Sequence, residues 1–239
     1  MINCAIIGTG KIGIDLYVKC KISNFVDNVE IYNQNHKSIG HIYCKKNNFR
    51  VFDTGINGIK KKIDDFDIII HATSSLSNKE NYKQIKNYLK NDKFFLNMTP
   101  SGIGNLYIPY FYDQEEIPNT LNLISCGGQS TIPIILSLKK YLKNSLVYVE
   151  VISSISSKSA GPATRSNVND YLLSTNNAIK FFSNIKKSKV ILNLNPSEPP
   201  VNMMNTIFFE CKKKINNNDV KKIKEIIFII NNKIKSYIP

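Results

Sequence analysis

A glycine-rich turn near residue 8 is the feature that most constrains the fold of this chain. The apolar run 2–7 is typical of a buried strand, and the sequence G-T-G-K-I-G follows it directly at 8–13. Apolar residues then recur at helical spacing at Ile12, Leu16 and Cys20. In such a context the first glycine permits a tight turn, the second lets a pyrophosphate approach the backbone, and the third lets helix pack on strand. The sequence therefore predicts a dinucleotide site formed by Gly8, Thr9, Gly10, Lys11, Ile12 and Gly13.

Strands and helices alternate through the first half of the chain. We expect strands at 28–32, 49–52, 67–72 and 94–98, and a helix at 78–89. This alternation predicts a doubly wound parallel sheet with helices on both faces, which is a Rossmann-type α/β fold. Asn33 follows the second strand, where an acid normally binds the ribose hydroxyls. Because asparagine does not repel a 2′-phosphate, the choice between NAD and NADP stays open.

The pattern changes to longer strands after residue 125. We expect strands at 146–157, 189–194 and 205–211, with helices at 166–183 and 219–237. The sequence therefore predicts two domains: a Rossmann-type NAD-binding domain at 1–125, and an α+β catalytic and dimerisation domain at 126–239.

Cys126 lies at the junction of these domains, in a context that favours chemistry. We expect a strand at 120–125, a turn through the glycines that follow Cys126, and a helix capped by Ser130. Near a helix N-terminus, unpaired N–H groups and the helix dipole favour an anion, so the pKa of the Cys126 thiol should fall. The same N–H groups could stabilise an oxyanion. A buried structural cysteine in a turn is the alternative.

The composition argues against several other classes of protein. The net charge of +14 would suit nucleic-acid binding, but the lysines are spread along the whole chain and accompany no nucleic-acid-binding motif. The five cysteines are scattered without CxxC spacing, which argues against a zinc site or a disulfide framework. The sequence shows neither an apolar run of membrane-spanning length nor a secretory signal, so we expect a cytoplasmic protein without a membrane partner.

Two loops in the second half are rich in small residues and proline, at 157–165 and 195–200. Ordinary turn chemistry is one explanation. The other is that the first loop offers N–H groups, hydroxyls and Arg165 to a cofactor or an acyl carrier.

Together these segments resemble the acylating acetaldehyde dehydrogenases, the enzymes that pair with a 4-hydroxy-2-oxovalerate aldolase. The similarity runs nearly end to end, and its most specific parts are C-G-G-Q at 126–129 and S-K-S-A-G-P at 157–162. It also rests on 5–16, Thr99-Pro100 with Gly104 and Pro109, 130–133, 155–156, Thr164, Arg165 and Asn167, and on 194–196 with 198–200.

The resemblance implies a reaction of an aldehyde, coenzyme A and NAD to give acyl-CoA and NADH. Cys126 would be the nucleophile that carries the acyl group as a thioester, and Asn205 would occupy the second catalytic position. The resemblance adds a second NAD-binding stretch to the glycine turn: Ser159, Ala160, Gly161, Pro162, Ala163, Thr164, Arg165, Ser166 and Asn167. It further implies a homo-oligomer, and an aldolase as a possible partner.

The chain departs from the family pattern at several points. The family has an aspartate where Asn205 stands, and its members continue for several elements beyond the last helix expected here, so we expect a chain shortened at its C-terminus. A decayed subunit that binds an aldolase without turnover is therefore one alternative. A semialdehyde or acyl-phosphate dehydrogenase is another, but such enzymes usually need a histidine base after the cysteine. Here His36 and His41 are expected in a polar loop and His71 at a strand end, all before Cys126.

Overall fold

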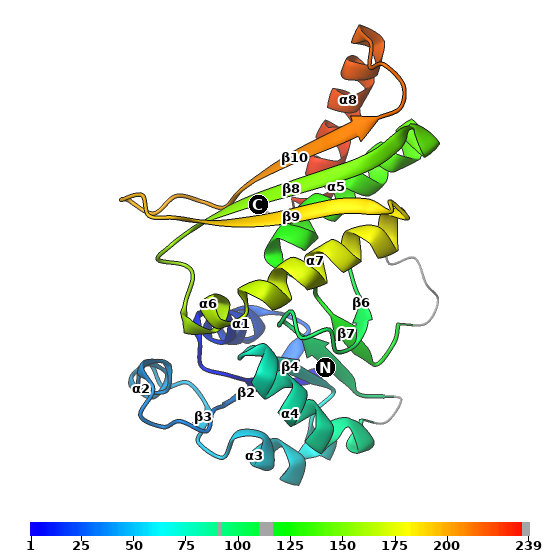
Figure 1. Ribbon diagram of the computed structural model, residues 1–239. Helices are drawn as coiled ribbons and strands as arrows, with labels where there is room; N and C mark the ends of the chain where they lie inside the picture. Colours follow the sequence, from blue (N-terminus) through cyan, green and yellow to red (C-terminus); the bar gives the residue numbers. More distant parts are fainter. Residues whose placement is uncertain (90–91, 110–116, 236–239) are drawn as a thin grey trace. The chain divides into compact units, whose positions relative to one another are not determined.

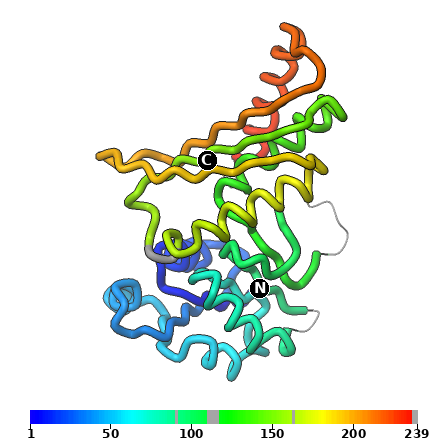
Figure 2. The backbone as a smooth tube through the Cα atoms, viewed as in Figure 1, coloured from blue at the N-terminus to red at the C-terminus, as the bar shows by residue number. Residues whose placement is uncertain are grey.

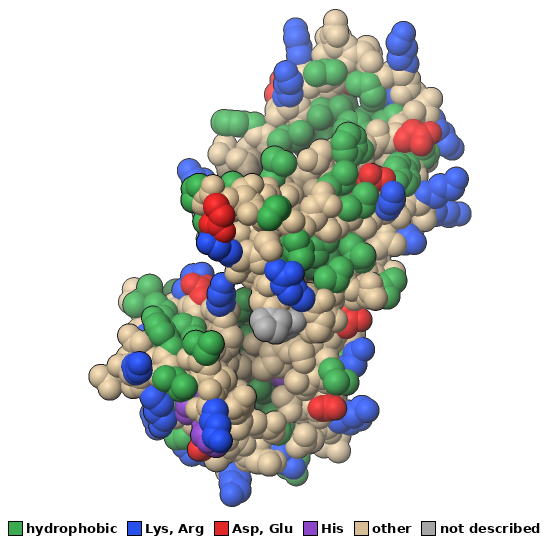
Figure 3. Space-filling model, turned by 60° about the vertical axis from the view of Figure 1, so that its left-hand side comes forward, with side chains coloured by type: hydrophobic (Ala, Val, Ile, Leu, Met, Phe, Trp, Pro, Cys, Tyr) green, Lys and Arg blue, Asp and Glu red, His purple; other side chains and the backbone are tan. Residues whose placement is uncertain are grey.

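The computed structural model describes residues 1–89, 92–109 and 117–235, which form two compact units (Figure 1). The N-terminal unit comprises Met1–Leu106 and Gln114–Leu123, and the C-terminal unit comprises Tyr107–Asp113 and Ile124–Pro239. Among the described helices, none is long and apolar enough to cross a membrane. On the face drawn in Figure 3, Lys and Arg side chains are spread over the surface and do not form one continuous stripe.

The N-terminal unit contains a parallel sheet of seven strands in the order β3-β2-β1-β4-β5-β7-β6. The strands are β1 (Ile2–Ile7), β2 (Val26–Tyr32), β3 (Val51–Phe52), β4 (Ile68–His71), β5 (Phe94–Asn97), β6 (Asn105–Leu106) and β7 (Thr120–Asn122). The helices are α1 (Lys11–Ile22), α2 (Ile39–Lys46), α3 (Gly55–Lys61) and α4 (Ser75–Ile85), with 3-10 turns at Ile63–Asp65 and Lys86–Tyr88. This topology confirms the predicted doubly wound fold.

Alternate residues of β1 supply two separate hydrophobic cores, one on each face of the sheet. Cys4 and Ile6 pack in the cluster that contains Tyr17 of α1 and Cys44 of α2. Ala5 and Ile7 pack with residues of α3 and α4 on the opposite face. Both faces of β1 are therefore buried, which explains why the strand is a continuous apolar run rather than an alternating one.

The C-terminal unit contains a three-stranded sheet in the order β10-β8-β9, in which β8 pairs antiparallel with β10 and parallel with β9. Its elements are α5 (Cys126–Leu142), a 3-10 turn at Lys143–Ser145, β8 (Leu146–Ser156), α6 (Pro162–Ser166), α7 (Val168–Ser183), β9 (Lys187–Asn195), β10 (Met204–Cys211) and α8 (Asn217–Ile234). Figure 2 shows the three strands side by side, although β8 is far from β9 and β10 in the sequence. Helices α5 and α7 pack on the sheet, and α8 packs on α5.

Several predicted boundaries were wrong. The strand expected at 120–125 ends at Asn122, and helix α5 begins at Cys126, because Ser125 rather than Ser130 caps it. The segment expected as a polar loop with His36 and His41 contains helix α2, and His41 is buried in it. The helix expected at 78–89 begins at Ser75 and ends at Ile85. Position 237, where the last helix was expected to end, lies outside the described residues.

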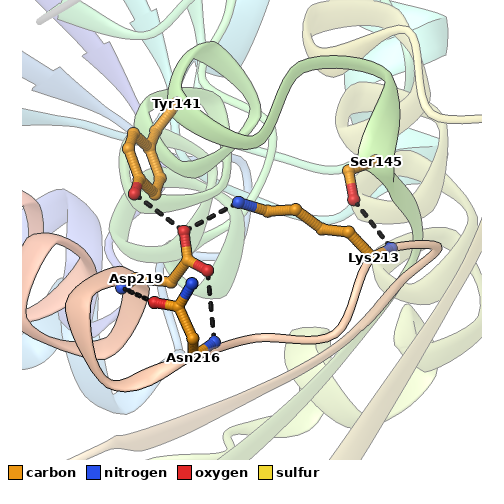
Figure 4. Close-up of polar contacts among 5 residues, drawn as sticks. All are labelled: Tyr141, Ser145, Lys213, Asn216 and Asp219. Carbon is orange, nitrogen blue, oxygen red and sulfur yellow. Dashed lines mark hydrogen bonds and ion pairs between the residues drawn. The ribbon is translucent and has the colours of Figure 1, made fainter.

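The N-terminus of α8 is held by a buried carboxylate, Asp219 (Figure 4). Asp219 accepts hydrogen bonds from the hydroxyl of Tyr141, the ammonium of Lys213 and the backbone N–H of Asn216, and the Asn216 side chain in return accepts from the N–H of Asp219. This reciprocal arrangement is a capping box. The Lys213 ammonium, the Asn216 N–H and the Tyr141 hydroxyl together lower the pKa of Asp219 from 3.8 to about 2.

We predict that Asp219→Asn lowers the free energy of unfolding at neutral pH, because the amide loses the charge-assisted bonds to Lys213 and Asn216. A carboxylate whose folded pKa is depressed stabilises the protein above its unfolded pKa, and this contribution is lost as the pH falls through the folded pKa. The stability gap between the native chain and the variant should therefore be constant from pH 5 to 7 and narrow below about pH 4. Urea unfolding across this pH range measures it.

Glu225→Gln is the matched control, because the exposed ion pair of Glu225 with Lys222 also lies on α8. Exposed pairs contribute little, so this variant should unfold almost as the native chain does. If the difference in stability between the native chain and Asp219→Asn did not depend on pH, the stabilisation would not come from an ionised Asp219 with a lowered pKa.

Candidate functional site

The three glycines of the first turn occupy the positions that a dinucleotide site requires. Gly8 has φ +113°, and a Cβ on it would lie 2.5 Å from the carbonyl oxygen of Ala72. A Cβ on Gly13 would lie 1.9 Å from the carbonyl oxygen of Gly8, so helix α1 packs directly on the turn. A Cβ on Gly10, in contrast, would meet nothing within 4 Å. Gly8 and Gly13 are therefore required by the fold, whereas Gly10 leaves space open to solvent.

The N-terminus of α1 is suited to an anion. Gly10 is its N-cap residue and has no side chain that could cap the first-turn N–H groups, which point out of the N-terminus of the helix. These N–H groups and the helix dipole favour a phosphate at this point. The arrangement fits the pyrophosphate of NAD, whose binding here stays a prediction for Thr9, Lys11 and Ile12 as well as the glycines.

Asn33 follows β2, and its side-chain amide bonds the loop that leads into α2. The side-chain NH₂ donates to Ser38 Oγ at 2.9 Å and to the carbonyl oxygen of Asn35 at 2.9 Å. Ser38 is the N-cap of α2 and accepts from the N–H of His41. Both donors of the Asn33 amide are thus committed to the loop before α2, and its oxygen is the atom with which it could accept a hydrogen bond from a ribose hydroxyl.

Cys126 is an exposed residue at the first position of helix α5. The Ser125 side chain caps the helix by accepting from the N–H of Gly128 at 2.9 Å. The expectation of a lowered pKa was wrong: desolvation by surrounding protein atoms raises the pKa of the Cys126 thiol, and the N–H groups of Gly127 and Cys126 offset this only in part. The helix N-terminus acts in the predicted direction, but the desolvation of the sulfur by the protein atoms around it has the larger effect on the pKa.

Asn205 is linked to the first turn of α5 by a chain of hydrogen bonds. It lies opposite Ser153 in the β10–β8 ladder, and Ser153 Oγ donates to Asn205 Oδ1 at 2.6 Å. Asn205 Nδ2 donates to Ser130 Oγ at 2.8 Å, and Ser130 Oγ donates to the carbonyl oxygen of Gly127 at 3.0 Å. Sequence analysis named Cys126 and Asn205 separately, and the structure joins them within one unit.

The second predicted NAD-binding stretch, at 159–167, covers the end of a loop and the short helix α6. Arg165 turns back onto this loop: its guanidinium donates to the carbonyl oxygen of Ala160 at 3.0 Å and to the carbonyl oxygen and hydroxyl of Ser157 at 3.1 and 3.0 Å. Arg165 therefore holds the conformation of the loop. The cofactor-binding role of the whole stretch stays a prediction.

The two small-residue loops of the C-terminal unit lie against each other. The N–H of Ser157 donates to the carbonyl oxygen of Asn195 at 2.7 Å, which continues the β8–β9 pairing. Lys158 and Glu198 form an ion pair at 2.6 Å, with more than half of each side chain exposed. The backbone contact fixes the loops, and the exposed pair adds little.

The histidines do not suggest a base for Cys126. His71 is buried at the end of β4, where Nε2 lies 3.0 Å from Asn81 Nδ2, and burial lowers its pKa to about 4. It is therefore neutral at physiological pH. His41 is also buried, and its pKa is lowered by burial and by Lys45.

Sequence reasoning missed the side chains that surround the start of α5. Ser125 could have been found as an N-cap, because serine directly precedes the helix. Ser130 was expected as the cap but lies inside α5, and no local signal marks Ser153 or Tyr171, since they come from two other elements. Within the described residues, no group of three His, Cys, Asp or Glu side chains could hold a metal ion.

Comparison with known proteins covers both units of the chain. Residues 126–239 match the family model described as "Prokaryotic acetaldehyde dehydrogenase, dimerisation". Acetaldehyde dehydrogenase of Burkholderia pseudomallei (strain K96243) is 33% identical over 236 residues, which cover 98% of this chain and 77% of that protein. Acetaldehyde dehydrogenase of Geobacillus stearothermophilus is 32% identical over 240 residues, which cover 100% and 79%. The resemblance inferred from the sequence is therefore confirmed, and the chain belongs to the acetaldehyde dehydrogenase family.

Proposed function

We propose that this protein oxidises acetaldehyde with NAD and transfers the acyl group to coenzyme A, giving acetyl-CoA and NADH. The observation that carries the proposal is the position of Cys126, exposed at the first residue of a capped helix and linked to Asn205 through Ser130. The acetaldehyde substrate follows from the names of the relatives, and the glycine turn at 8–13 supports NAD.

The chemistry of Cys126 proceeds in two halves. In the first, the thiolate adds to the carbonyl carbon of the aldehyde, so an S–C bond forms and the carbonyl π pair moves to oxygen. The backbone N–H groups of Cys126 and Gly127, at the start of α5, would stabilise this oxyanion. NAD, when bound, supplies the hydride acceptor that converts the adduct to a thioester. In the second half, the thiolate of coenzyme A attacks the thioester carbon and the Cys126 sulfur leaves.

Asn205 cannot act as the base for the second half. A carboxamide accepts no proton at physiological pH, and both ends of this amide are already bonded to serine hydroxyls. General-base contributions are typically about 100- to 10,000-fold, so deacylation should be the slow step. The raised pKa of the Cys126 thiol and the neutral Asn205 also favour a second candidate, a decayed subunit that binds its ligands without turnover. An aldolase is the partner that the resemblance suggests for either candidate.

We also propose that the protein is a homo-oligomer that associates through the C-terminal unit. The family model matched by residues 126–239 is that of a dimerisation domain. Along β10, Met204 and Phe208 are exposed on the side of the sheet opposite to the half-buried Asn205 and Ile207. A second copy of this chain would cover these apolar side chains. A monomeric mass in light scattering would contradict this arrangement.

Cys126→Ser should reduce the formation of acetyl-CoA by about 10⁴-fold or more, because serine is a far weaker nucleophile at neutral pH. NAD affinity measured by calorimetry should be unchanged, since the glycine turn lies in the other unit. Near-normal turnover in the serine variant would reduce Cys126 to a structural residue.

Gly10→Val should weaken NAD binding by at least about tenfold, equivalent to ~1.4 kcal/mol. The side chain would occupy the open space at the turn, and the extended conformation of Gly10 (φ −73°, ψ 175°) accepts valine without strain. Circular dichroism should therefore be native, and calorimetry measures the affinity. Gly13→Val is the contrasting variant, which should fail to fold because its Cβ would collide with the Gly8 carbonyl. Native affinity in Gly10→Val would refute the dinucleotide assignment.

Asn205→Asp should speed the second half of the reaction by about 100-fold, because the carboxylate can accept the proton of the coenzyme A thiol. The native chain should release a burst of NADH and then nearly stop, whereas the variant should sustain turnover. Rapid-mixing absorbance of NADH on both forms measures this, with Cys126→Ser as the control that gives no burst. Equal steady rates would show that position 205 is not limiting, and no burst from either form would favour the decayed subunit.

A further inference from the structure

Tyr171 is a buried residue of helix α7 whose hydroxyl the proposed reaction does not yet use. Only 7% of its surface is exposed. Its hydroxyl has no hydrogen-bonding partner within the part of the chain that the structure describes. A buried hydroxyl without a partner costs free energy, so an unpaired one beside a functional group suggests that its partner forms during function.

The Tyr171 hydroxyl lies against the first turn of α5, next to the cysteine. A Cβ on Gly127 would lie 2.2 Å from the Tyr171 hydroxyl oxygen and 2.5 Å from Ser153 Oγ. Gly127 is the residue that directly follows Cys126. The phenol therefore reaches the turn from which the thiol projects, in space that only a glycine leaves free.

The hydroxyl groups of Ser153, Thr175 and Ser125 already donate hydrogen bonds to other acceptors. Ser153 donates to Asn205. Thr175 donates to the backbone carbonyl of Tyr171 at 2.7 Å, so in its 2.7 Å contact with Ser125 it must be the acceptor and Ser125 the donor. Neither serine can then donate to Tyr171. The phenol proton is the one hydroxyl proton of this group that remains available.

Tyr171 keeps that proton throughout the physiological range. Burial, and then the negative charge of an ionised Cys126, raise the pKa of Tyr171 to about 12, although the nearby hydroxyls of Ser153 and Ser125 and the N–H of Gly127 offset part of this rise. Cys126 is the titratable group that acts on Tyr171 through its charge, while desolvation and the N–H groups of Gly127 and Cys126 act on the thiol itself. The phenol is therefore a neutral donor close to a sulfur that must become an anion.

We propose that the Tyr171 hydroxyl donates a hydrogen bond to the Cys126 sulfur when the thiol ionises, and so stabilises the thiolate. The donor would partly compensate the desolvation of the sulfur, in addition to the N–H groups of the helix. This inference rests on the proposed nucleophilic role of Cys126. Its test, however, needs neither cofactor nor substrate, so it can fail independently of that role.

The test is the pH dependence of the alkylation of Cys126 by iodoacetamide in the native chain and in Tyr171→Phe. The Cys126 peptide is quantified by mass spectrometry from pH 6 to 11. Loss of the donor should raise the thiol pKa by about one unit, so that alkylation below the pKa slows about tenfold. Cys211, in the same unit, is an internal control whose profile should not move.

Tyr141→Phe is the matched variant, because it removes a hydroxyl of the same unit that is bonded to Asp219 instead. It should leave the Cys126 profile unchanged. The urea midpoint separates a structural role: Tyr171→Phe should keep or raise it, because the hydroxyl removed has no partner in the folded chain. An unchanged Cys126 pKa in Tyr171→Phe overturns the proposal, and so does a lowered urea midpoint together with an unchanged pKa, which would mean that the phenol bonds Ser153 instead.

Discussion

The close approach of α5 to β8 and α7 at Gly127 is the constraint on which the candidate site depends. No side chain fits at Gly127, since a Cβ would overlap both the Tyr171 hydroxyl and Ser153 Oγ. This contact brings the first turn of the helix against the sheet, so that Ser130 can accept from Asn205 while Cys126 remains exposed. The glycine at this position is therefore required by packing.

The parts of the structure that follow from local patterns could be predicted from the sequence. The glycine turn at 8–13 was found because its spacing directly determines a turn, an opening and a packing contact. The strands β8, β9 and β10 were found because each is a long apolar or alternating run. The start of α5 was misplaced because two glycines weaken helix propensity, and the tertiary contact at Gly127 compensates for that weakness. Helix α2 was missed because, of its eight residues, only His41 and Cys44 are buried.

The arrangement around Cys126 could not be predicted, because its hydrogen bonds join residues 52 to 75 positions apart. The pKa of the Cys126 thiol depends on two opposing effects, the helix N-terminus and desolvation, whose relative size cannot be read from the sequence. A helix N-terminus lowers a thiol pKa, but the desolvation that opposes it depends on the protein atoms that folding brings around the sulfur. His71 shows the same effect, since its burial in the folded chain lowers its pKa.

The orientation of the Asn205 side-chain amide follows from which of the neighbouring groups donate hydrogen bonds and which accept them. Ser130 gives its proton to the carbonyl oxygen of Gly127, so its oxygen must accept, and the amide NH₂ of Asn205 must face it. Ser153 then finds the amide oxygen as its acceptor. An aspartate at this position would accept from both serines, and Ser130 would have to release the Gly127 carbonyl. Asparagine thus keeps the helix turn and the sheet joined with every partner satisfied, but it leaves no group in this network that can take a proton.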